Sequence, residues 1–140
     1  MSAPTPTSSA SSSRLRPKPL AHALALASSA LPIGFGLNCL LNPASALSFF
    51  GLAYNPLTAG DKQALDLLLA IYGARDVFMG VALVLAAYYG GRRTTGAVLV
   101  AVAAVAGADG AACWAWGTGE EWAHWGYAPL LVALGLYLVV

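Results

Sequence analysis

Charged side chains are scarce in this sequence. Of its 140 residues, 9% are charged and 59% are hydrophobic, and the mean hydropathy is +0.69. Water-soluble domains carry about 25% charged residues, and a surface so poor in charge would associate in water. We therefore expect lipid to be the solvent. A formal net charge of +1 also provides no basic face of the kind that binds a nucleic acid duplex, so we expect no nucleic acid partner.

Cysteine and histidine are also scarce. Two cysteines, Cys39 and Cys113, are too few for a disulfide framework and lack the spacing of a zinc site. Both fall near the outer ends of apolar segments, so a disulfide and two separate small core residues are both open interpretations. The two histidines are predicted at opposite membrane faces, and we find no phosphate-binding loop, nucleotide fingerprint or serine elbow. We expect no metal and no other cofactor.

What the sequence has instead is long apolar runs. Four of them are long enough to cross a hydrocarbon core of roughly 30 Å as helices: residues about 20–41, 63–89, 94–117 and 122–140. The predicted fold is all-α, a four-helix transmembrane bundle over residues 20–140. Residues 1–19 are rich in Ser, Pro, Thr and Ala and are predicted to form a disordered cytoplasmic tail. A signal or transit peptide at this end is the minority interpretation.

The basic residues predict the orientation of the bundle. They lie before the first span and between the second and third, two segments that four crossings place on the same side: Arg14, Arg16, Lys18, Arg92 and Arg93. Positive loops are retained in the cytoplasm. Four tryptophans cluster at the other end of spans three and four, as in an aromatic belt: Trp114, Trp116, Trp122 and Trp125. We expect an integral membrane protein of the endoplasmic reticulum or another endomembrane, with a cytoplasmic N-terminus.

Arg75 and Asp76 interrupt the middle of the second span. Each charged residue there costs roughly 2.5 to 3.5 kcal/mol on insertion scales, so something must offset the cost. Arg75 lies about 21 Å from the cytoplasmic end of its span, and Asp109 lies about 22 Å from the same end of span three. The two residues are therefore predicted to pair, and together with Asp76 they are the candidate catalytic residues.

Several further residues are predicted to surround this group. Tyr72 and Met79 fall in the helical sector between Arg75 and Asp76, where they would line a substrate-binding groove. His124 and Asp66 begin their spans near the outer interface and would form the mouth of the same cavity. Gly73 and Gly80 share an arc with Asp76, where they would let another helix approach closely.

A purely structural interpretation competes for each of these residues. The Asp, Arg and Asp side chains would then form a buried ion-pair network that fixes helix register and contributes little net stability. His124 would sit in the headgroup zone. Asp66 would be a first-turn carboxylate favoured by the helix dipole.

Four segments resemble a known family. The stretches Pro43 to Gly51 (PASALSFFG), Tyr72 to Gly80 (YGARDVFMG) and Ala108-Asp109-Gly110, and His124 with Gly135-Leu136-Tyr137, are similar to a mainly fungal group of small four-span membrane proteins. That group is catalogued as a domain of unknown function. The resemblance covers nearly everything after the tail, and its most specific piece is Gly73-Ala74-Arg75-Asp76. Some similar proteins occur in fungal secondary-metabolite pathways, which implies hydrolysis or cyclisation of an epoxide.

The residue types suit that reaction. Opening an epoxide requires a base that activates water or an internal hydroxyl, and an acid that protonates the leaving oxygen. Since Arg75 neutralises only one of Asp76 and Asp109, we expect the other carboxyl to hold a proton in a dry site. The limonene-epoxide hydrolases use a similar Asp-Arg-Asp arrangement on an unrelated soluble fold, which is an analogy of site only. Which aspartate is the acid stays open here.

Two other functions stay open at this point. In a small carrier or proton-coupled transporter the same carboxylates would relay protons, and four short spans would enclose a pore only in a homo-oligomer. In a non-enzymatic membrane scaffold the small-residue faces of spans two and three would be assembly surfaces. For the enzyme, the expected partners are a lipophilic small-molecule substrate and the bilayer itself.

Overall fold

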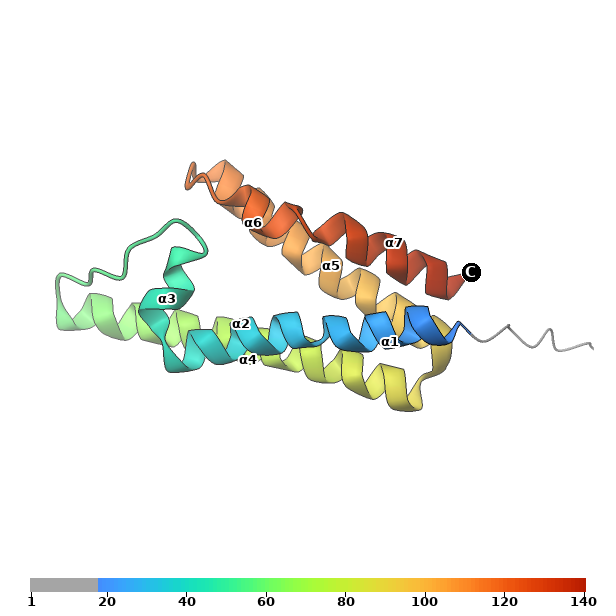
Figure 1. Ribbon diagram of the computed structural model, residues 1–140. Helices are drawn as coiled ribbons and strands as arrows, with labels where there is room; N and C mark the ends of the chain where they lie inside the picture. Colours follow the sequence, from blue (N-terminus) through green and yellow to red (C-terminus); the bar gives the residue numbers. More distant parts are fainter. Residues whose placement is uncertain (1–17) are drawn as a thin grey trace, which may run out of the picture.

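The computed structural model describes residues 18–140, so the predicted tail falls almost entirely outside the described residues. The described chain forms helices and no strand. Its helices are α1 (Pro19–Ser28), α2 (Ala30–Leu41), α3 (Pro43–Ser48), α4 (Ala59–Tyr89), α5 (Gly91–Ala115), α6 (Glu121–Trp125) and α7 (Ala128–Val139) (Figure 1). The all-α prediction is therefore confirmed.

Four stretches of helix are long and apolar enough to cross a membrane. They are Pro19–Leu41, Ala59–Tyr89, Gly91–Ala115 and Glu121–Val139. Two of them are interrupted, and each interruption comes four residues before a proline: α1 ends at Ser28 before Pro32, and α6 ends at Trp125 before Pro129. A proline ring collides with the carbonyl four residues earlier and provides no N–H donor, which accounts for both breaks.

Helix α4 begins at Ala59, four residues before the start of the second span predicted from hydropathy. The Thr58 side chain accepts a hydrogen bond from the Asp61 backbone N–H, and the Asp61 side chain accepts one from the Thr58 N–H. This capping box satisfies two of the free N–H groups at the helix start. The additional turn belongs to the polar end of the helix, which the apolar pattern does not mark.

The helices form two closely packed pairs that diverge like the arms of a V. Helix α2 packs along α4, and α5 packs along α7, whereas α2 contacts neither α5 nor α7. The arms meet where α4 turns into α5 and separate toward α3 and α6 (Figure 1). Helix α1 lies at the narrow end in contact with α4, α5 and α7. A buried cluster there joins both arms, and it includes Ala25, Leu83, Leu99 and Leu138.

Glycines allow the two helices of each arm to touch. A Cβ atom added to Gly36 of α2 would lie 2.6 Å from the Gly73 carbonyl oxygen of α4, and one added to Gly80 would lie 2.9 Å from the Ser29 oxygen. In the other arm, a Cβ on Gly96 would lie 2.5 Å from the Gly135 oxygen. The expectation that Gly73 and Gly80 admit a neighbouring helix is confirmed, and that neighbour is the α1–α2 span.

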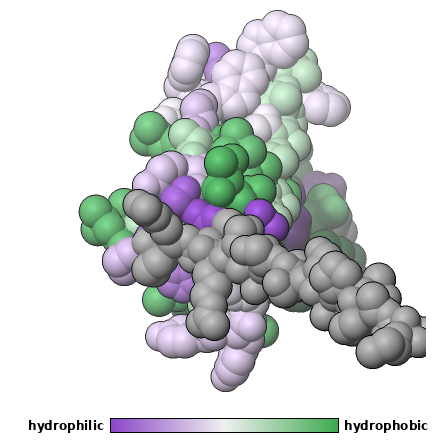
Figure 2. Space-filling model, turned by 90° about the vertical axis from the view of Figure 1, so that its right-hand side faces the viewer, coloured by the Kyte–Doolittle hydropathy of each residue, from purple (hydrophilic) through white to green (hydrophobic). Residues whose placement is uncertain are grey.

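The two ends of the V differ in polarity. At the narrow end, Lys18 Nζ donates to the Tyr137 carbonyl and Arg92 Nη2 donates to the Val140 carbonyl, at 2.5 and 3.1 Å. Figure 2 views this end and shows hydrophilic surface next to apolar surface. At the open end, three tryptophans are exposed: Trp114, Trp116 and Trp122. Trp125 instead turns inward and donates from its indole N–H to the Gly107 carbonyl.

Candidate functional site

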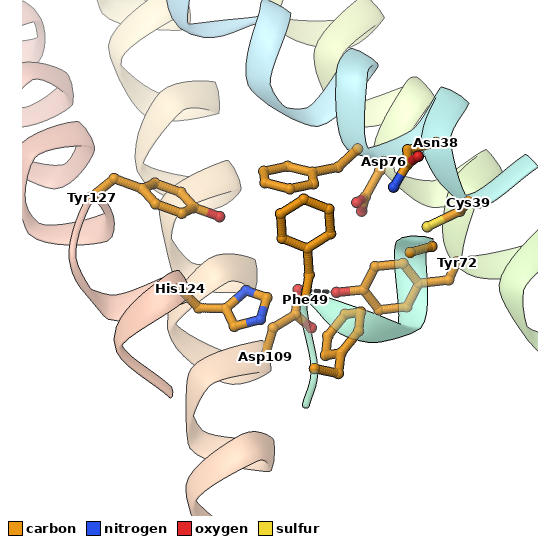
Figure 3. Close-up of a pocket in the computed structure, with 11 residues that line it drawn as sticks. Asn38, Cys39, Phe49, Tyr72, Asp76, Asp109, His124 and Tyr127 are labelled. Carbon is orange, nitrogen blue, oxygen red and sulfur yellow. Dashed lines mark hydrogen bonds between the residues drawn. The ribbon is translucent and has the colours of Figure 1, made fainter. Parts of the chain in front are cut away.

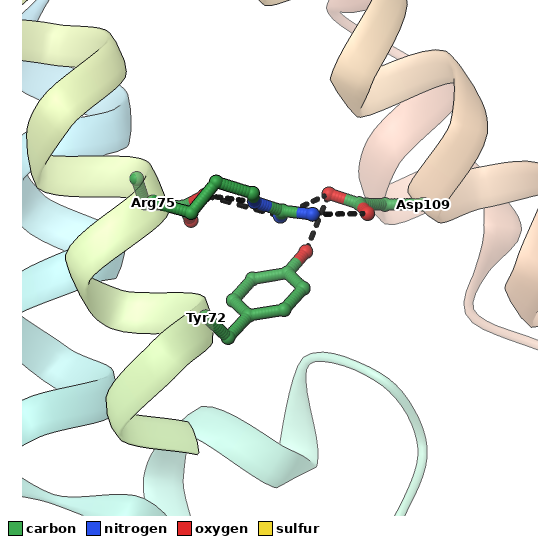
Figure 4. A network of polar contacts seen from close by, with 4 residues as sticks. Tyr72, Arg75 and Asp109 are labelled. Atoms are coloured by element: carbon green, nitrogen blue, oxygen red, sulfur yellow. Dashed lines mark hydrogen bonds and ion pairs between the residues drawn. The ribbon is translucent and has the colours of Figure 1, made fainter. Parts of the chain in front are cut away.

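Arg75 of α4 bridges two aspartates across the V. Its Nε donates to Asp76 Oδ1 at 3.1 Å, and its Nη1 and Nη2 donate to Asp109 Oδ1 and Oδ2 at 3.4 and 3.0 Å (Figure 4). Nη2 also lies 3.1 Å from Asp76 Oδ1, so one nitrogen is close to both carboxylates. The predicted pair between Arg75 and Asp109 is confirmed. It connects one arm to the other, because Asp109 belongs to α5.

Tyr72 completes this network from one turn before Arg75. Its hydroxyl donates to Asp109 Oδ2 (Figure 4), and the Arg75 guanidinium carbon lies 3.7 Å from the centre of the Tyr72 ring. A cation over an aromatic face is attracted by the ring electrons. Asp109 therefore accepts hydrogen bonds from Arg75 on both oxygens and from Tyr72 on Oδ2. Among the described residues Asp76 accepts from Arg75 alone, through Oδ1.

Burial differs across the network. The Asp76 and Asp109 side chains are 8% and 16% exposed, whereas the Arg75 side chain is 36% exposed. The two carboxylates are thus largely buried, whereas the Arg75 side chain is partly exposed. Two opposite charges in a low-dielectric interior attract strongly, but they repay their desolvation only when the geometry is good. The paired hydrogen bonds from Arg75 to Asp109 meet that condition.

A cavity lies between the arms next to this network, and we call it the polar cavity. Its wall includes Asn38, Tyr72, Asp76, Asp109 and His124, and Figure 3 shows these side chains converging from both arms. It encloses about 330 Å³ with its mouth included. The free space inside accommodates about two water molecules. Water therefore fits directly against the carboxylates.

A second cavity shares these aspartates, and we call it the apolar cavity because most of its other wall residues are apolar. Its wall includes Leu31, Met79, Val102 and Leu131, and it encloses about 340 Å³ with its mouth included. Asp76, Asp109, Phe35 and Tyr127 belong to the walls of both cavities. The two carboxylates therefore lie in the common wall of the two cavities.

His124 provides an unused polar atom in the polar cavity. Its side chain is buried, and its Nε2 has no hydrogen-bond partner among the described residues. The ring stacks on Phe50, with ring centres 5.1 Å apart. A buried polar atom without a partner costs about 1 to 3 kcal/mol. A ligand that hydrogen-bonds His124 would recover that cost.

Asp66 lies elsewhere. It accepts hydrogen bonds from the Tyr54 hydroxyl at 2.6 Å and from Lys62 at 2.5 Å, and it lines a separate surface groove. The structure therefore brings Tyr72, Arg75, Asp76, Asp109 and His124 together at the polar cavity and Met79 to the apolar cavity. Asp66 is not brought to either. The expectation that Asp66 and His124 form one mouth does not match this arrangement.

We expect the hydrogen bond between Tyr54 and Asp66 to make the stability of the fold fall as the pH becomes alkaline. Its hydroxyl bond to the Asp66 carboxylate, reinforced by desolvation, raises the pKa of Tyr54. A group whose pKa is raised by folding stabilises the fold below its unfolded value, about 10 for tyrosine, and loses that contribution as the pH rises further. We expect the unfolding midpoint of the wild type to decrease between pH about 8 and about 11, and that of Tyr54→Phe to decrease less over the same range. Equal losses would contradict this coupling.

Some residues of the cavity walls were not predicted from the sequence. Asn38 and Tyr127 are polar residues within apolar spans, and that signal was available for both. Phe35, Phe49 and Phe50 carry no such signal, because an aromatic residue in a membrane span is ordinarily core or lipid-facing. Phe49 and Phe50 come directly after α3 and reach the wall of the polar cavity, where Figure 3 shows Phe49.

Neither cysteine pairs with the other: Cys39 and Cys113 are both buried and free. Cys39 lines the polar cavity, and Cys113 is buried near the end of α5. Within residues 18–140 no group of three His, Cys, Asp or Glu side chains is placed to hold a metal ion.

Comparison with known proteins identifies one family. A family model described as a domain of unknown function (DUF4267) matches residues 29–138, a range that includes the whole Arg75 network and both cavities. No curated protein and no solved structure matches the chain.

Proposed function

The chain belongs to the DUF4267 family, and from its geometry we propose that it is a membrane enzyme that opens the epoxide of a lipophilic small molecule. The observation that carries the proposal is the Asp76–Arg75–Asp109 network, whose two carboxylates lie in the common wall of a water-sized polar cavity and an apolar cavity. Ionisable residues inside a membrane span are costly and ordinarily mark a functional site. The resemblance to proteins of fungal secondary-metabolite pathways supports an epoxide as the reacting group.

The network distributes the acid and base roles unequally. Asp76, Arg75 and Asp109 carry two potential negative charges and one positive charge, so a single proton makes the group neutral. Asp109 accepts hydrogen bonds from Arg75 and Tyr72, which stabilise its ionised form, whereas Asp76 accepts only from Arg75. We assign the proton to Asp76 as general acid and the role of general base to Asp109.

The reaction then proceeds with balanced atoms. A water molecule, or a hydroxyl of the substrate, attacks one epoxide carbon while Asp109 takes its proton. The bond between that carbon and the epoxide oxygen breaks, and Asp76 gives its proton to the oxygen. Water yields a diol and an internal hydroxyl yields a cyclic ether. A proton then returns from Asp109 to Asp76, and Arg75 holds both carboxylates in place throughout.

The remaining predicted site residues take binding roles in this proposal. His124 Nε2 hydrogen-bonds a polar group of the substrate in the polar cavity, and Tyr72 holds Asp109 in position. Met79 contacts the carbon atoms next to the epoxide from the wall of the apolar cavity. No cofactor enters the reaction. Lys18, Arg92 and Arg93 at the narrow end support a cytoplasmic N-terminus in an endomembrane, with the open end of the V on the far side.

Heavy-oxygen labelling tests the activity directly. The purified protein in lipid nanodiscs would be incubated in labelled water with hexadecene oxide, squalene oxide and styrene oxide. We expect a diol carrying one heavy oxygen from at least one of the three epoxides, none of which has a hydroxyl group that could attack internally. Absence of a labelled diol from all three would overturn the proposal. Uptake of an unchanged epoxide into sealed liposomes would indicate a carrier instead.

A further inference from the structure

An open groove runs along the outside of α2 next to α3, and we call it the outer groove. Its wall includes Ala30, Leu31, Gly34, Ser45 and Phe49, and it holds about 550 Å³ including the open space in front of it. Gly34 lies about 22 Å along the span that begins at Pro19, and Arg75 lies about 21 Å from the end of α4 on the same side. The outer groove is therefore at the depth of the candidate site.

Two aromatic side chains separate the outer groove from the site. Phe35 and Phe49 line both the outer groove and the polar cavity, and their rings meet edge to face with centres 5.0 Å apart. Phe35 also lines the apolar cavity, as does Leu31 of the outer groove. The wall between lipid-facing surface and carboxylates is therefore no thicker than these side chains.

The outer groove is much larger than either inner cavity. Each inner cavity accommodates only about two water molecules, so a long apolar molecule does not fit inside. The outer groove has room for such a molecule, because the small residues Ala30 and Gly34 leave space along its base. Its polar atoms belong to Asn38 and Ser45, which are joined by a hydrogen bond of 3.2 Å from Asn38 Nδ2 to Ser45 Oγ. A molecule with a long apolar chain and one oxygen-bearing end matches this lining.

We propose that the substrate is a long-chain epoxide that reaches the site sideways from the bilayer, with its chain lying over Gly34 in the outer groove. Its epoxide end passes between Phe35 and Phe49 to Asp76 and Asp109. Phe49 is 41% exposed, and exposed side chains change rotamer within nanoseconds, so this wall opens without unfolding a helix. The inference rests on the proposed function and specifies the substrate class and its route.

Gly34→Leu tests the route, because it fills the outer groove without disturbing helix packing. A Cβ at Gly34 meets no atom within 4 Å, and the same holds for Gly107 on the other arm, which makes Gly107→Leu a matched control. We expect the ratio of kcat/KM for hexadecene oxide to that for propylene oxide to fall at least about tenfold in Gly34→Leu and to stay at the wild-type value in Gly107→Leu. An unchanged ratio in Gly34→Leu would overturn the route.

Photolabelling separates this inference from the proposed function. A hexadecanol that carries a diazirine, added to the wild-type protein in nanodiscs, should label the segment from Leu31 to Phe35. We expect hexadecene oxide to displace the label and Gly34→Leu to reduce it at least about fivefold relative to Gly107→Leu. Labelling that hexadecene oxide does not displace would show that a bilayer lipid occupies the groove, and would overturn the inference. Displaceable labelling without turnover of any epoxide would overturn the activity alone.

Discussion

Asp109→Asn is expected to abolish epoxide opening, with kcat reduced between about a hundredfold and ten-thousandfold. The amide keeps the size of the side chain but cannot take a proton from water, and a positioned acid or base contributes a factor of that order. Product formation would be measured with whichever epoxide the wild-type protein turns over. Glu120→Gln makes the same change at an exposed carboxylate outside both cavities and should retain wild-type activity.

The fold should tolerate this replacement. In Asp109→Asn, Asp76 would give up the proton assigned to it above and pair with Arg75 as a carboxylate, so no unpaired charge is left in the span. Breaking a buried pair costs about 3 to 5 kcal/mol when one charge is left alone, and here the remaining pair is neutral. A variant that accumulates in the membrane but lacks activity would support the catalytic assignment. Full activity in Asp109→Asn would reduce the network to a structural ion pair.

Gly36→Val should cause the largest loss of stability. Its Cβ would lie 2.6 Å from the Gly73 carbonyl oxygen and 2.7 Å from the Val77 nitrogen, both backbone atoms of α4 that cannot move separately. Overpacking costs about 1 to 3 kcal/mol, and occasionally more. The expected result is a lower midpoint when the folded protein is titrated with a denaturing detergent in mixed micelles.

Gly34→Val is the matched control for this prediction. It lies on the same helix two residues earlier and makes the same change in helix propensity, but its Cβ meets no atom within 4 Å. The difference between the two midpoints therefore measures helix contact alone. If both variants lost the same stability, backbone propensity rather than the α2–α4 contact would explain the effect.

The depth of the site could be predicted from the sequence because helices are regular. A constant rise per residue placed Arg75 and Asp109 at the same level, and the pair is present in the structure. The close approach of a helix at Gly73 and Gly80 followed from the same regularity, since both share a face with Asp76. Counting residues along a helix thus predicts the depth of a residue in the membrane and the side of the helix on which it lies, because neither depends on the adjacent helices.

The remaining features depend on contacts between distant segments. Nothing in the apolar pattern indicates that α2 avoids α5 and α7, and so the V shape was not predictable. Asp66 lines a separate groove and is hydrogen-bonded to Tyr54, which precedes α4 in a loop that hydropathy does not describe. Phe35 and Phe49 became candidates only when α3 brought them together.

We expect the divergence of the two arms to make the site sensitive to the thickness of the bilayer. Arg75 and Asp76 lie on one arm and Asp109 lies on the other, so a change in the angle between the arms would change the distance between the proposed acid and base. An embedded helix changes its tilt to match the hydrophobic thickness of the bilayer, which differs between membranes of different lipid and sterol content. A bilayer that favours a small angle between the arms would bring Asp76 and Asp109 together. A bilayer that favours a larger angle would separate them and lower the activity.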